Sequence, residues 1–427
     1  MLYNKVICVN APWIVNGVHG CRAGSRWPFS GSGGYKPYPH LLGYAVAYLR
    51  ESMGDNVKFL DAIALDMRYD TFYNECKKFA PELIVFETST PTFNHDMRVI
   101  EKLKNDCKCD ICLVGAHVSA TQIRVDDKNV DYVIAGDYEN ALLGICLGEE
   151  KKGFGRISRP VDVANYLPLP YLDKQYVGLY RDTIGPKACK AVKTPQLHIY
   201  PSRGCHKKCK FCQWTHALYK GKVQYMPVDR VMEEIDRGIN EFGVKDIFID
   251  SDSFGYGGDR WLLEFAEEIG KRKVPYSIMT TEGLIKKEMF KVLRESGCYA
   301  VRIGLETFSQ GLYDTIGKGG NVQDIVDLIK YLLELDLYVH YTIMWKLLGE
   351  TEEDVRITRE MINQLDSSPK CDHQESICVP FPGTPYFDMY DKAGIKEIWN
   401  FDGYDGNPCN PATDNFIRII KEKAGRL

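Results

Sequence analysis

The chain has 427 residues, which is enough for two or three domains with a substantial core. Hydrophobic residues make up 44% and charged residues 26% of it, and the net charge is −4 without a long basic run, which gives no electrostatic footprint for nucleic acid. No apolar stretch is long enough to span a membrane, and the amino terminus lacks the features of a signal peptide. We therefore expect a cytoplasmic, monomeric protein that binds neither membrane nor nucleic acid.

The first 148 residues alternate segments that are typical of strands and of helices. The predicted strands are Val6–Asn10, Val57–Leu60, Leu83–Glu87, Ile111–Gly115 and Tyr132–Ala135. Between them, the predicted helices are His40–Glu51, Thr71–Phe79, Asn94–Asn105 and Tyr138–Leu147. This order predicts an α/β domain with a doubly wound, Rossmann-like parallel sheet, whose ligand would bind at the carboxyl ends of the strands.

Small and polar residues follow three of these strands. They stand in the segments Glu87-Thr-Ser-Thr-Pro-Thr, Val114-Gly-Ala-His-Val-Ser-Ala and Ala135-Gly-Asp-Tyr-Glu-Asn. Small side chains let a large, flat ligand approach the backbone, and hydroxyls offer it hydrogen bonds. Ordinary turn and helix-cap chemistry uses the same residue types, so each segment alone leaves both interpretations open.

The second half of the chain begins after a polar, proline-punctuated linker, 149–193. Residues 194–386 again alternate, which predicts a partial (β/α)6 barrel with its functional groups at the strand carboxyl ends. We expect the short extension, 387–427, to pack on this barrel. The predicted barrel strands are Gln196–Tyr200, Asp246–Asp250, Tyr276–Met279, Ala300–Leu305, Tyr338–Met344 and Glu375–Val379; the predicted helices include Val228–Phe242, Arg260–Lys271, Lys287–Ser296, Val322–Leu335 and Glu352–Leu365.

A cysteine motif directly follows the first barrel strand. It reads Gly204-Cys-His-Lys-Lys-Cys-Lys-Phe-Cys, so Cys205, Cys209 and Cys212 are spaced Cys-x3-Cys-x2-Cys. Thiolates are the ligands of iron–sulfur clusters, and three of them leave the fourth iron of a 4Fe–4S cluster open to bind a substrate. The alternative is zinc, which usually takes four ligands, commonly as separated Cys-x2-Cys pairs.

The motif resembles that of radical S-adenosylmethionine (radical SAM) enzymes, including the aromatic Phe211 before the last cysteine. The resemblance implies that S-adenosylmethionine chelates the open iron and is cleaved to a 5′-deoxyadenosyl radical. It also implies further S-adenosylmethionine-binding residues at strand ends, although helix caps or ion pairs would use the same types. These residues are Asp250, Asp252, Thr280, Arg302 and Glu306. The fifth strand departs from the family pattern, because Trp345 and Lys346 replace small residues; Trp345 either reshapes the nucleoside cavity or packs in the core.

The order of the two domains resembles cobalamin-binding radical SAM enzymes, most of all the cobalamin-dependent methyltransferases. The resemblance covers nearly the whole chain and implies that the three polar segments of the first domain contact cobalamin. The Asp-x-His-x-x-Gly motif that supplies a cobalt ligand is absent. The implied cobalamin-binding residues are Thr88, Ser89, Thr90, Gly115, His117, Ser119, Gly136 and Glu139.

Other cysteines allow two further hypotheses. Cys107, Cys109 and Cys112 are close in sequence and suggest a second cluster, but alternation along a strand would place neighbours on opposite faces. A methylthiotransferase would need an additional cluster in its first domain, for which Cys8 and Cys76 are candidates.

The resemblance implies an enzyme, a cobalamin-dependent radical SAM methyltransferase that methylates an unactivated carbon by way of the 5′-deoxyadenosyl radical and methylcobalamin. A ferredoxin- or flavodoxin-type protein would donate the electron. The substrate would be a peptide, a protein or a small molecule, and we favour a peptide or protein side chain. The alternatives are a cobalamin-binding cyclase or isomerase without methyl transfer, and a methylthiotransferase-like enzyme.

Overall fold

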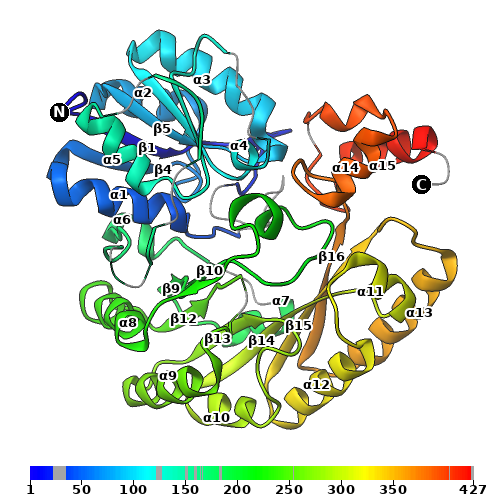
Figure 1. Ribbon diagram of the computed structural model, residues 1–427. Coiled ribbons are helices and arrows are strands. Elements are labelled where there is room, and N and C mark those ends of the chain that lie inside the picture. Colours follow the sequence, from blue (N-terminus) through cyan, green and yellow to red (C-terminus); the bar gives the residue numbers. More distant parts are fainter. Residues whose placement is uncertain are drawn as a thin grey trace. The chain divides into compact units, whose positions relative to one another are not determined.

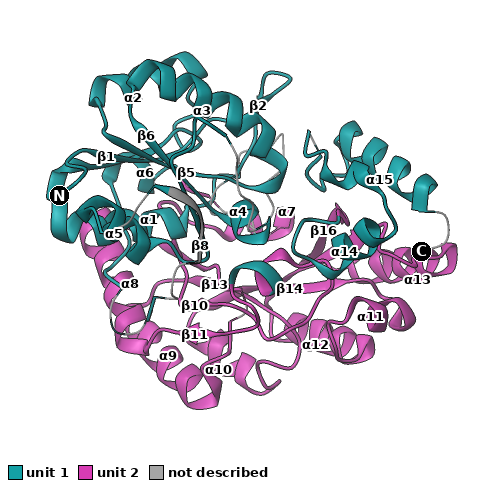
Figure 2. Ribbon diagram, turned by 45° about the horizontal axis from the view of Figure 1, so that its top comes forward, with its two compact units in different colours: residues 1–179, 216–218, 380–424 teal, residues 180–215, 219–379, 425–427 magenta. Residues whose placement is uncertain are grey.

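A computed structural model describes most of the chain (Figure 1). The described residues are 1–22, 35–121, 127–149, 152–157, 161–163, 165, 167–181, 185–252, 254–402 and 404–424. They form two compact units, drawn in different colours in Figure 2. Unit 1 consists of Met1–Leu179, His216–Leu218 and Pro380–Ala424, and unit 2 of Tyr180–Thr215 and Tyr219–Val379.

Unit 1 is built on a six-stranded parallel sheet, in which the five predicted strands recur with bounds that differ by at most one residue at either end. A sixth strand, β8, pairs with β7 inside the predicted linker. We did not predict this strand, because its sequence contains glycine and an edge strand needs less apolar burial than a central one. In spatial order the strands are β4 (Val57–Asp61), β1 (Val6–Asn10), β5 (Leu83–Glu87), β6 (Asp110–Val114), β7 (Tyr132–Ala135) and β8 (Gly153–Ile157).

Helices cover both faces of this sheet, as the strand–helix alternation predicts. Side chains of α2 and α3 pack with Ile7 and Val9 of β1 in one apolar core, while α1 contacts β1, β4 and α5. The helices of this part are α1 (His40–Met53), α2 (Tyr69–Phe79), α3 (Phe93–Cys107), α4 (Ala116–Thr121), α5 (Glu139–Leu147) and α6 (Lys174–Val177), with 3-10 turns η1 (Gly54–Asn56) and η2 (Thr90–Thr92) and a hairpin of β2 (Ile14–Val15) and β3 (Val18–His19).

The order of the strands creates a switch point between β1 and β5. The chain moves from β1 outward to β4 and then returns to the other side of β1 to form β5. Connections that leave in opposite directions open a crevice at the strand carboxyl ends, which is where doubly wound sheets bind ligands. The ligand edge of unit 1 is therefore formed by the residues that follow Asn10 and Glu87.

Unit 2 is the predicted partial barrel of six parallel strands. Helices follow the strands and cover the outside of the sheet (Figure 1). The strands, in spatial order, are β16 (Cys371–Ile377), β15 (Tyr338–Trp345), β14 (Cys298–Glu306), β13 (Tyr276–Thr280), β12 (Asp246–Ile249) and β9 (Gln196–Ile199). The helices are α7 (Gly185–Ala188), α8 (Val228–Phe242), α9 (Gly258–Arg272), α10 (Met289–Glu295), α11 (Gln310–Ile316), α12 (Val322–Glu334) and α13 (Glu352–Leu365), with the 3-10 turn η3 (Cys189–Ala191). The π-helical turn η4 (Trp214–Leu218) begins in unit 2, and its last three residues belong to unit 1.

The short helix α7 closes the amino-terminal end of this barrel. The ammonium group of Lys187 donates to the carbonyls of Asp366, Ser368 and Cys371, each at 2.7 Å, and all three precede or begin β16. The amide of Lys187 donates to the Asp372 carboxylate at 2.5 Å. With this end closed, the carboxyl ends of the strands are left for chemistry.

The carboxyl-terminal segment belongs to unit 1, whereas we expected it to pack on the barrel. It contains α14 (Pro385–Lys392), η5 (Lys396–Trp399) and α15 (Pro411–Ala424). The Phe401 ring lies edge-on to His117, with ring centroids 4.9 Å apart, and Gly383 contacts Ala120 closely. The segment carries aromatic residues that complete the apolar surroundings of α4, and length alone gave no sign of this.

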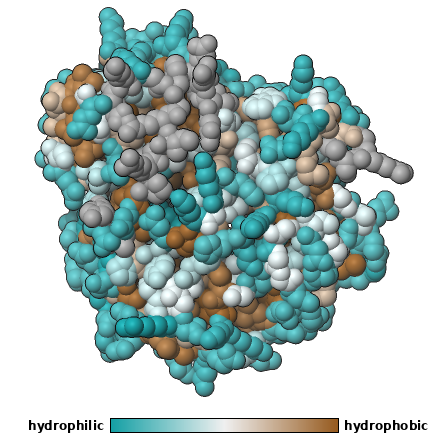
Figure 3. Space-filling view, in the orientation of Figure 1, coloured by the Kyte–Doolittle hydropathy of each residue, from teal (hydrophilic) through white to brown (hydrophobic). Residues whose placement is uncertain are grey.

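On the face shown in Figure 3, hydrophilic residues predominate and hydrophobic ones are scattered among them. Within the described residues, no helix combines the length and the apolar composition needed to cross a bilayer.

Candidate functional site

The cysteine loop starts where the first barrel strand, β9, ends. The two-residue strand β10 (Ser202–Arg203) follows and pairs antiparallel with β11 (Gln224–Tyr225), so the whole loop is closed at its base. Gly204 has φ +97°, and a Cβ atom there would lie 1.8 Å from the carbonyl oxygen of Lys222. Only glycine allows the two sides of the loop to approach so closely.

Two side chains hold this loop in place. The Asp252 carboxylate, which follows β12, accepts the Gly204 N–H at 2.6 Å and the Tyr200 hydroxyl at 2.7 Å. The hydroxyl of Thr215 lies 2.8 Å from the carbonyl oxygens of both Cys205 and Lys207. We predicted Asp252 as a ligand for the ammonium group of S-adenosylmethionine; in the structure its oxygens bind the cysteine loop.

The three thiols differ in exposure. Cys209 is buried, whereas Cys205 and Cys212 are partly exposed. Burial raises the pKa of Cys209 to about 12 and that of Cys212 to about 11. The protein alone therefore keeps both thiols protonated, and metal binding would displace the protons.

The arrangement of ligand-type side chains also bears on the zinc hypothesis. Among the residues that the structure describes, no group of three or more His, Cys, Asp or Glu side chains is placed to hold a single metal ion. A 4Fe–4S cluster makes a different demand, because each of its cysteines binds a different iron atom.

Tyr256 contacts the cysteine motif, and we did not predict it as a site residue from the sequence. Its hydroxyl lies 3.3 Å from Cys205 Sγ and accepts the amide N–H of His206 at 2.8 Å. The His206 ring lies edge-on against the Tyr256 ring at 5.1 Å. Its position in Phe254-Gly-Tyr-Gly-Gly, just after a barrel strand, was the available signal.

Among the other residues predicted to bind S-adenosylmethionine, three lie at the carboxyl ends of barrel strands, namely Asp250, Thr280 and Glu306. Arg302 lies in the middle of β14, and Phe211 lies in the cysteine loop. Asp250 and Arg302 are buried, and Phe211 is partly exposed. The Arg302 guanidinium lies 5.6 Å from the centre of the Phe248 ring, inside the barrel. The Thr280 hydroxyl donates to the Phe254 carbonyl at 2.7 Å, so it orders the loop that carries Tyr256.

Glu306 forms a buried ion pair that the sequence did not reveal. Lys318 Nζ lies 2.8 Å from Glu306 Oε1 and donates to the Gly304 carbonyl at 2.6 Å. Burial by itself would lower the pKa of Lys318, but the charges of Glu306 and then Cys209 outweigh it and raise that pKa. A cation is therefore held close to a cysteine of the motif. Glu306 has φ +82° at a β-bulge, a strained conformation of the kind found at functional sites.

The residues that depart from the family pattern lie on or beside the outer face of the barrel. Trp345 is buried, and the Arg359 guanidinium of α13 stacks on its ring at 4.2 Å. Lys346 has φ +64°, and its amide donates to Glu350 Oε2 at 2.9 Å. Packing against α13 accounts for Trp345.

At the switch point of unit 1, a buried arginine bridges β1 and β5. Arg22 donates to the carbonyls of Ala11 at 3.3 Å and Glu87 at 2.6 Å, and pairs with Asp96 of α3 at 2.6 Å. Arg22 and Asp96 are almost fully buried. Burial raises the pKa of the neighbouring Glu87 to about 7. Sequence reasoning missed Arg22 and Asp96, because a lone arginine in a loop carries no pattern.

Most of the hydroxyls predicted to contact cobalamin hydrogen-bond within unit 1. Thr88 donates to Asp96 at 2.7 Å, Thr90 bonds to His117 Nδ1 at 3.1 Å, and Ser89 caps η2. Ser119 donates to the Gly115 carbonyl at 2.7 Å and accepts the Gly136 amide at 2.9 Å. Glu139 is buried at the start of α5. These contacts bring the three polar segments together at one edge.

Gly115 is required by close packing at this edge. Its φ is +113°, and a Cβ atom would lie 2.4 Å from the carbonyl oxygen of Thr88. Gly136 also has a positive φ, +83°. Glycine at Gly115 therefore lets the carboxyl end of β6 pack closely against the backbone of Thr88.

His117 lies in the short helix α4. Its ring stacks on Phe93 with centroids 4.1 Å apart and meets Phe401 on another side. Burial lowers its pKa to about 3, so the imidazole is neutral. Within the described part of the chain, no hydrogen-bond partner reaches Nε2 of His117.

The five other cysteines that the sequence suggested as cluster ligands separate onto the two faces of the unit 1 sheet. Cys76, Cys107 and Cys109 belong to the core beneath α2 and α3. Cys8 and Cys112 alternate with residues of that core, so they lie on the opposite face. The Cys107–Cys109–Cys112 cluster and the Cys8–Cys76 pair are therefore not formed.

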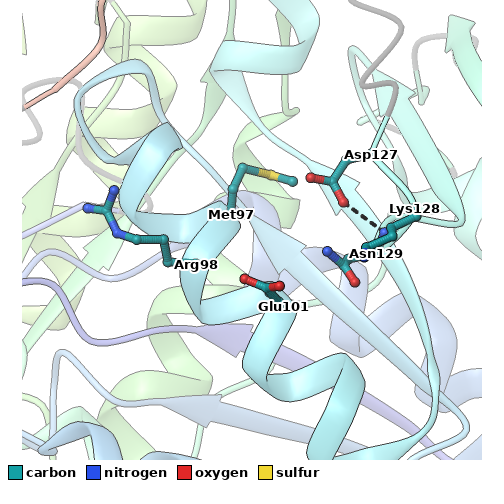
Figure 4. Close-up of a pocket in the computed structure, with 6 residues that line it drawn as sticks. All are labelled: Met97, Arg98, Glu101, Asp127, Lys128 and Asn129. Atoms are coloured by element: carbon teal, nitrogen blue, oxygen red, sulfur yellow. Dashed lines mark hydrogen bonds between the residues drawn. The ribbon is translucent and has the colours of Figure 1, made fainter.

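A surface hollow in unit 1 contains none of the predicted site residues. It has a volume of about 530 Å³ and is lined by Met97, Arg98 and Glu101 of α3 and by Asp127, Lys128 and Asn129 (Figure 4). Its open, mixed-charge lining distinguishes it from the strand-end sites.

Comparison with known proteins matches residues 199–362 to the Radical SAM superfamily. The chain is 26% identical over 362 residues to an uncharacterized methyltransferase of Pyrococcus horikoshii, covering 81% of this chain and 77% of that one. It is 24% identical over 368 residues to cytidylyl-2-hydroxyethylphosphonate methyltransferase of Streptomyces wedmorensis, with 71% and 68% covered. It is 22% identical over 415 residues to anaerobic magnesium-protoporphyrin IX monomethyl ester cyclase of Rubrivivax gelatinosus, with 90% and 70% covered.

Two solved structures share the fold. The radical S-adenosylmethionine methyltransferase TsrM from Kitasatospora setae, solved with cobalamin and a [4Fe-4S] cluster, superposes with a TM-score of 0.68 at 15% identity, covering 92% of this chain and 78% of that one. The cobalamin-dependent radical enzyme OxsB, solved with aqua-cobalamin and S-adenosylmethionine, gives 0.67 at 14% identity, covering 97% and 56%.

Proposed function

We propose that this chain is a cobalamin-dependent radical SAM methyltransferase acting on carbon, because residues 199–362 match the Radical SAM superfamily and the chain is similar to an uncharacterized methyltransferase over most of its length. The observation that carries the proposal is the cysteine loop, which is fixed at the carboxyl end of the first barrel strand by Asp252 and Thr215. Cys205, Cys209 and Cys212 would hold a 4Fe–4S cluster there.

The donor set fits such a cluster. Three thiols on one loop leave one iron free of protein ligands, and Tyr256 supplies a hydrogen bond to a coordinating sulfur. When bound, the cluster and S-adenosylmethionine supply a 5′-deoxyadenosyl radical, and cobalamin supplies a methyl carrier. The protein positions these groups: Asp252 orders the loop, and Asp250, Arg302, Thr280, Glu306 and Phe211 would surround S-adenosylmethionine.

The ligand edge of unit 1 has glycines that suit a large, flat cofactor, but its hydroxyls are largely taken up by hydrogen bonds within the domain. Gly115 and Gly136 put residues without side chains at the ends of β6 and β7, and Nε2 of His117 is buried without a protein partner among the described residues. The hydroxyls of Thr88, Thr90 and Ser119 are already used within the domain. We propose that cobalamin is held mainly through backbone and shape, without a histidine ligand from an Asp-x-His-x-x-Gly motif.

The substrate stays a prediction. From the sequence we favoured a peptide or protein side chain. Similar proteins, however, are named for small-molecule substrates, such as cytidylyl-2-hydroxyethylphosphonate. An assay must therefore compare both classes.

The test uses methyl-labelled S-adenosylmethionine with the anaerobically reconstituted protein, cobalamin, and extracts fractionated into small molecules and peptides. Methyl transfer predicts label in a carbon-bound product together with one 5′-deoxyadenosine per turnover. Formation of 5′-deoxyadenosine without labelled product would contradict methyl transfer.

A cyclase is the second candidate, because the Rubrivivax cyclase covers 90% of this chain. Both functions consume S-adenosylmethionine, so only the fate of the methyl label separates them. A cyclised, unlabelled product would establish the cyclase.

A further inference from the structure

The cysteine loop and the turn that follows it have an uneven charge. Between Cys205 and Met226 there are five lysines and neither aspartate nor glutamate. The whole chain, in contrast, has more acidic than basic residues, 58 against 54. Positive charge is therefore concentrated in the segment that carries the three cysteines.

The fold brings these lysines onto one small surface. The turn that contains Lys220 and Lys222 lies against the start of the loop, since Gly221 O bonds to His206 Nδ1 at 3.0 Å and Lys222 O abuts Gly204. The β10–β11 pairing fixes the base of this arrangement. Lys208, Lys220 and Lys222 are exposed, and Lys210 is partly exposed.

Most of these lysines have no acidic neighbour. Lys207 pairs with Glu282 at 2.6 Å. Within the described residues, the ammonium groups of Lys208, Lys210, Lys220 and Lys222 form no ion pair. Other surface lysines do pair, for example Lys271 with Glu268 at 2.6 Å. Unpaired like charges repel one another, so a cluster of them is a cost to stability that a binding role would explain.

We propose that this surface, the lysine face (Lys207, Lys208, Lys210, Lys220 and Lys222), is the docking site of an acidic one-electron-donor protein of the flavodoxin type. The inference rests on the proposed function, since it places the donor beside the cluster that needs the electron. A flavodoxin hydroquinone loses one electron to become the semiquinone, and the oxidised cluster gains that electron. Opposite charges speed such encounters and orient the partners.

Nucleic acid is a poorer fit to the same charges. Affinity for a phosphate backbone grows with the number of phosphates that are neutralised, and the five lysines of this face offer few such contacts. The two aromatic residues of the η4 region, Trp214 and Tyr219, are packed on each other at 6.1 Å and are not displayed for base stacking.

The test is a charge reversal with a matched control. The test variant is Lys208→Glu/Lys220→Glu/Lys222→Glu. The control is Lys190→Glu/Lys245→Glu/Lys330→Glu, which makes the same charge change at exposed lysines that have no ion pair within the described residues and lie outside the lysine face. Lys245 immediately precedes β12 and is therefore at the amino-terminal end of the barrel.

Two measurements are made on the full-length protein. The first is the dissociation constant of fluorescently labelled oxidised flavodoxin by anisotropy. The second is the rate of cluster bleaching by flavodoxin hydroquinone in a stopped-flow instrument, compared with photoreduced 5-deazariboflavin, which is small and uncharged. At low ionic strength we expect the test variant to bind at least about tenfold more weakly and to be reduced by flavodoxin at least about tenfold more slowly. The control variant and the deazariboflavin rates should stay within about twofold of the unchanged protein, and 0.5 M salt should remove the difference.

Several outcomes would overturn the proposal. Equal slowing in both triple variants would indicate net charge rather than this face, and unchanged flavodoxin binding in the test variant would exclude the face altogether. As a further outcome, a 20-nucleotide RNA could bind the unchanged protein more tightly than flavodoxin does. If the test variant loses this RNA binding, the face is assigned to nucleic acid. Absence of iron in the unchanged protein would defeat the proposed function, while the anisotropy measurement would still test the surface. If the triple glutamate variant fails to fold, the triple alanine variant is measured in its place.

Discussion

The Tyr256 hydroxyl donates its hydrogen to Cys205 Sγ. The hydroxyl oxygen already accepts the His206 N–H at 2.8 Å, and the 3.3 Å contact to sulfur is left for its own hydrogen. A cysteine that ligates iron carries no proton, so it can only accept in this contact. Hydrogen bonds to coordinating sulfurs stabilise the more negative, reduced state of a cluster and so raise its potential.

We therefore predict that Tyr256→Phe lowers the midpoint potential of the cluster without loss of iron. The measurement is a redox titration of the reconstituted protein followed by electron paramagnetic resonance. Tyr299→Phe is the matched control, because the Tyr299 hydroxyl contacts Asp246, which begins β12 at the opposite end of the barrel. An unchanged potential in Tyr256→Phe would show that the hydroxyl only positions the loop.

Cys209→Ala should abolish the cluster, because it removes one of only three protein ligands. We expect iron and sulfide contents near zero and no cleavage of S-adenosylmethionine, with bound cobalamin retained. Cys107→Ser and Cys112→Ser should leave the iron content unchanged, since these residues point to opposite faces of the unit 1 sheet. Loss of iron in either serine variant would revive a second cluster.

Asp96→Asn should destabilise unit 1 strongly, because it leaves the Arg22 guanidinium buried opposite a neutral group. Breaking a buried pair costs about 3–5 kcal/mol, and we expect a loss near the lower limit because the amide oxygen still accepts a hydrogen bond. The measurement is denaturant unfolding of the full chain. Asp66→Asn, which breaks the exposed Lys36–Asp66 pair, should cost less than about 1 kcal/mol. Equal effects of the two substitutions would contradict the buried network.

Acid should weaken unit 1 through His117, whose pKa burial lowers from 6.5 to about 3. Between these values the unfolded chain binds the proton and the folded chain does not, so stability falls as the pH falls below 6.5. Glu87 opposes this trend, because burial raises its pKa to about 7 and the folded chain holds its proton up to that pH. The comparison must therefore be made between variants.

His117→Phe keeps an aromatic ring between Phe93 and Phe401 and removes the titration. The stability difference between the unchanged protein and this variant should change by about 1.4 kcal/mol per pH unit between pH 6 and pH 4. A difference that is independent of pH would mean that His117 is charged in the folded protein.

Lys318→Met should both destabilise unit 2 and weaken binding of S-adenosylmethionine. It leaves the Glu306 carboxylate buried without its cation, which costs about 3–5 kcal/mol. Glu306→Gln combined with Lys318→Met should recover part of the stability, because the uncompensated charge is gone. If the double variant also binds S-adenosylmethionine as the unchanged protein does, Glu306 has a structural role only. Equilibrium dialysis of both variants measures the affinity.

Local sequence determined the elements and the cysteine motif. The strands recur because short runs of β-branched and apolar residues between turn residues fit only a buried strand, and the helices recur because apolar residues repeat along one face. The triad at Cys205, Cys209 and Cys212 was visible because all three ligands lie on one loop. Its spacing is a local property, and no other part of the chain is needed to recognise it.

Tertiary structure decided which side chains meet across the chain. Arg22 meets Asp96 and Tyr256 meets Cys205 only because parallel strands bring distant loops to one edge. Lys318 meets Glu306 because the chain folds back after α11 to the end of β14. The same folding uses the hydroxyls of Thr88 and Ser119 inside the domain and places Phe401 of the carboxyl-terminal segment on His117. Sequence shows which groups are available to bind a ligand, but their hydrogen bonds depend on neighbours that are far away in the chain. The surroundings of the cysteine triad, including the lysine face beside it, follow from the fold.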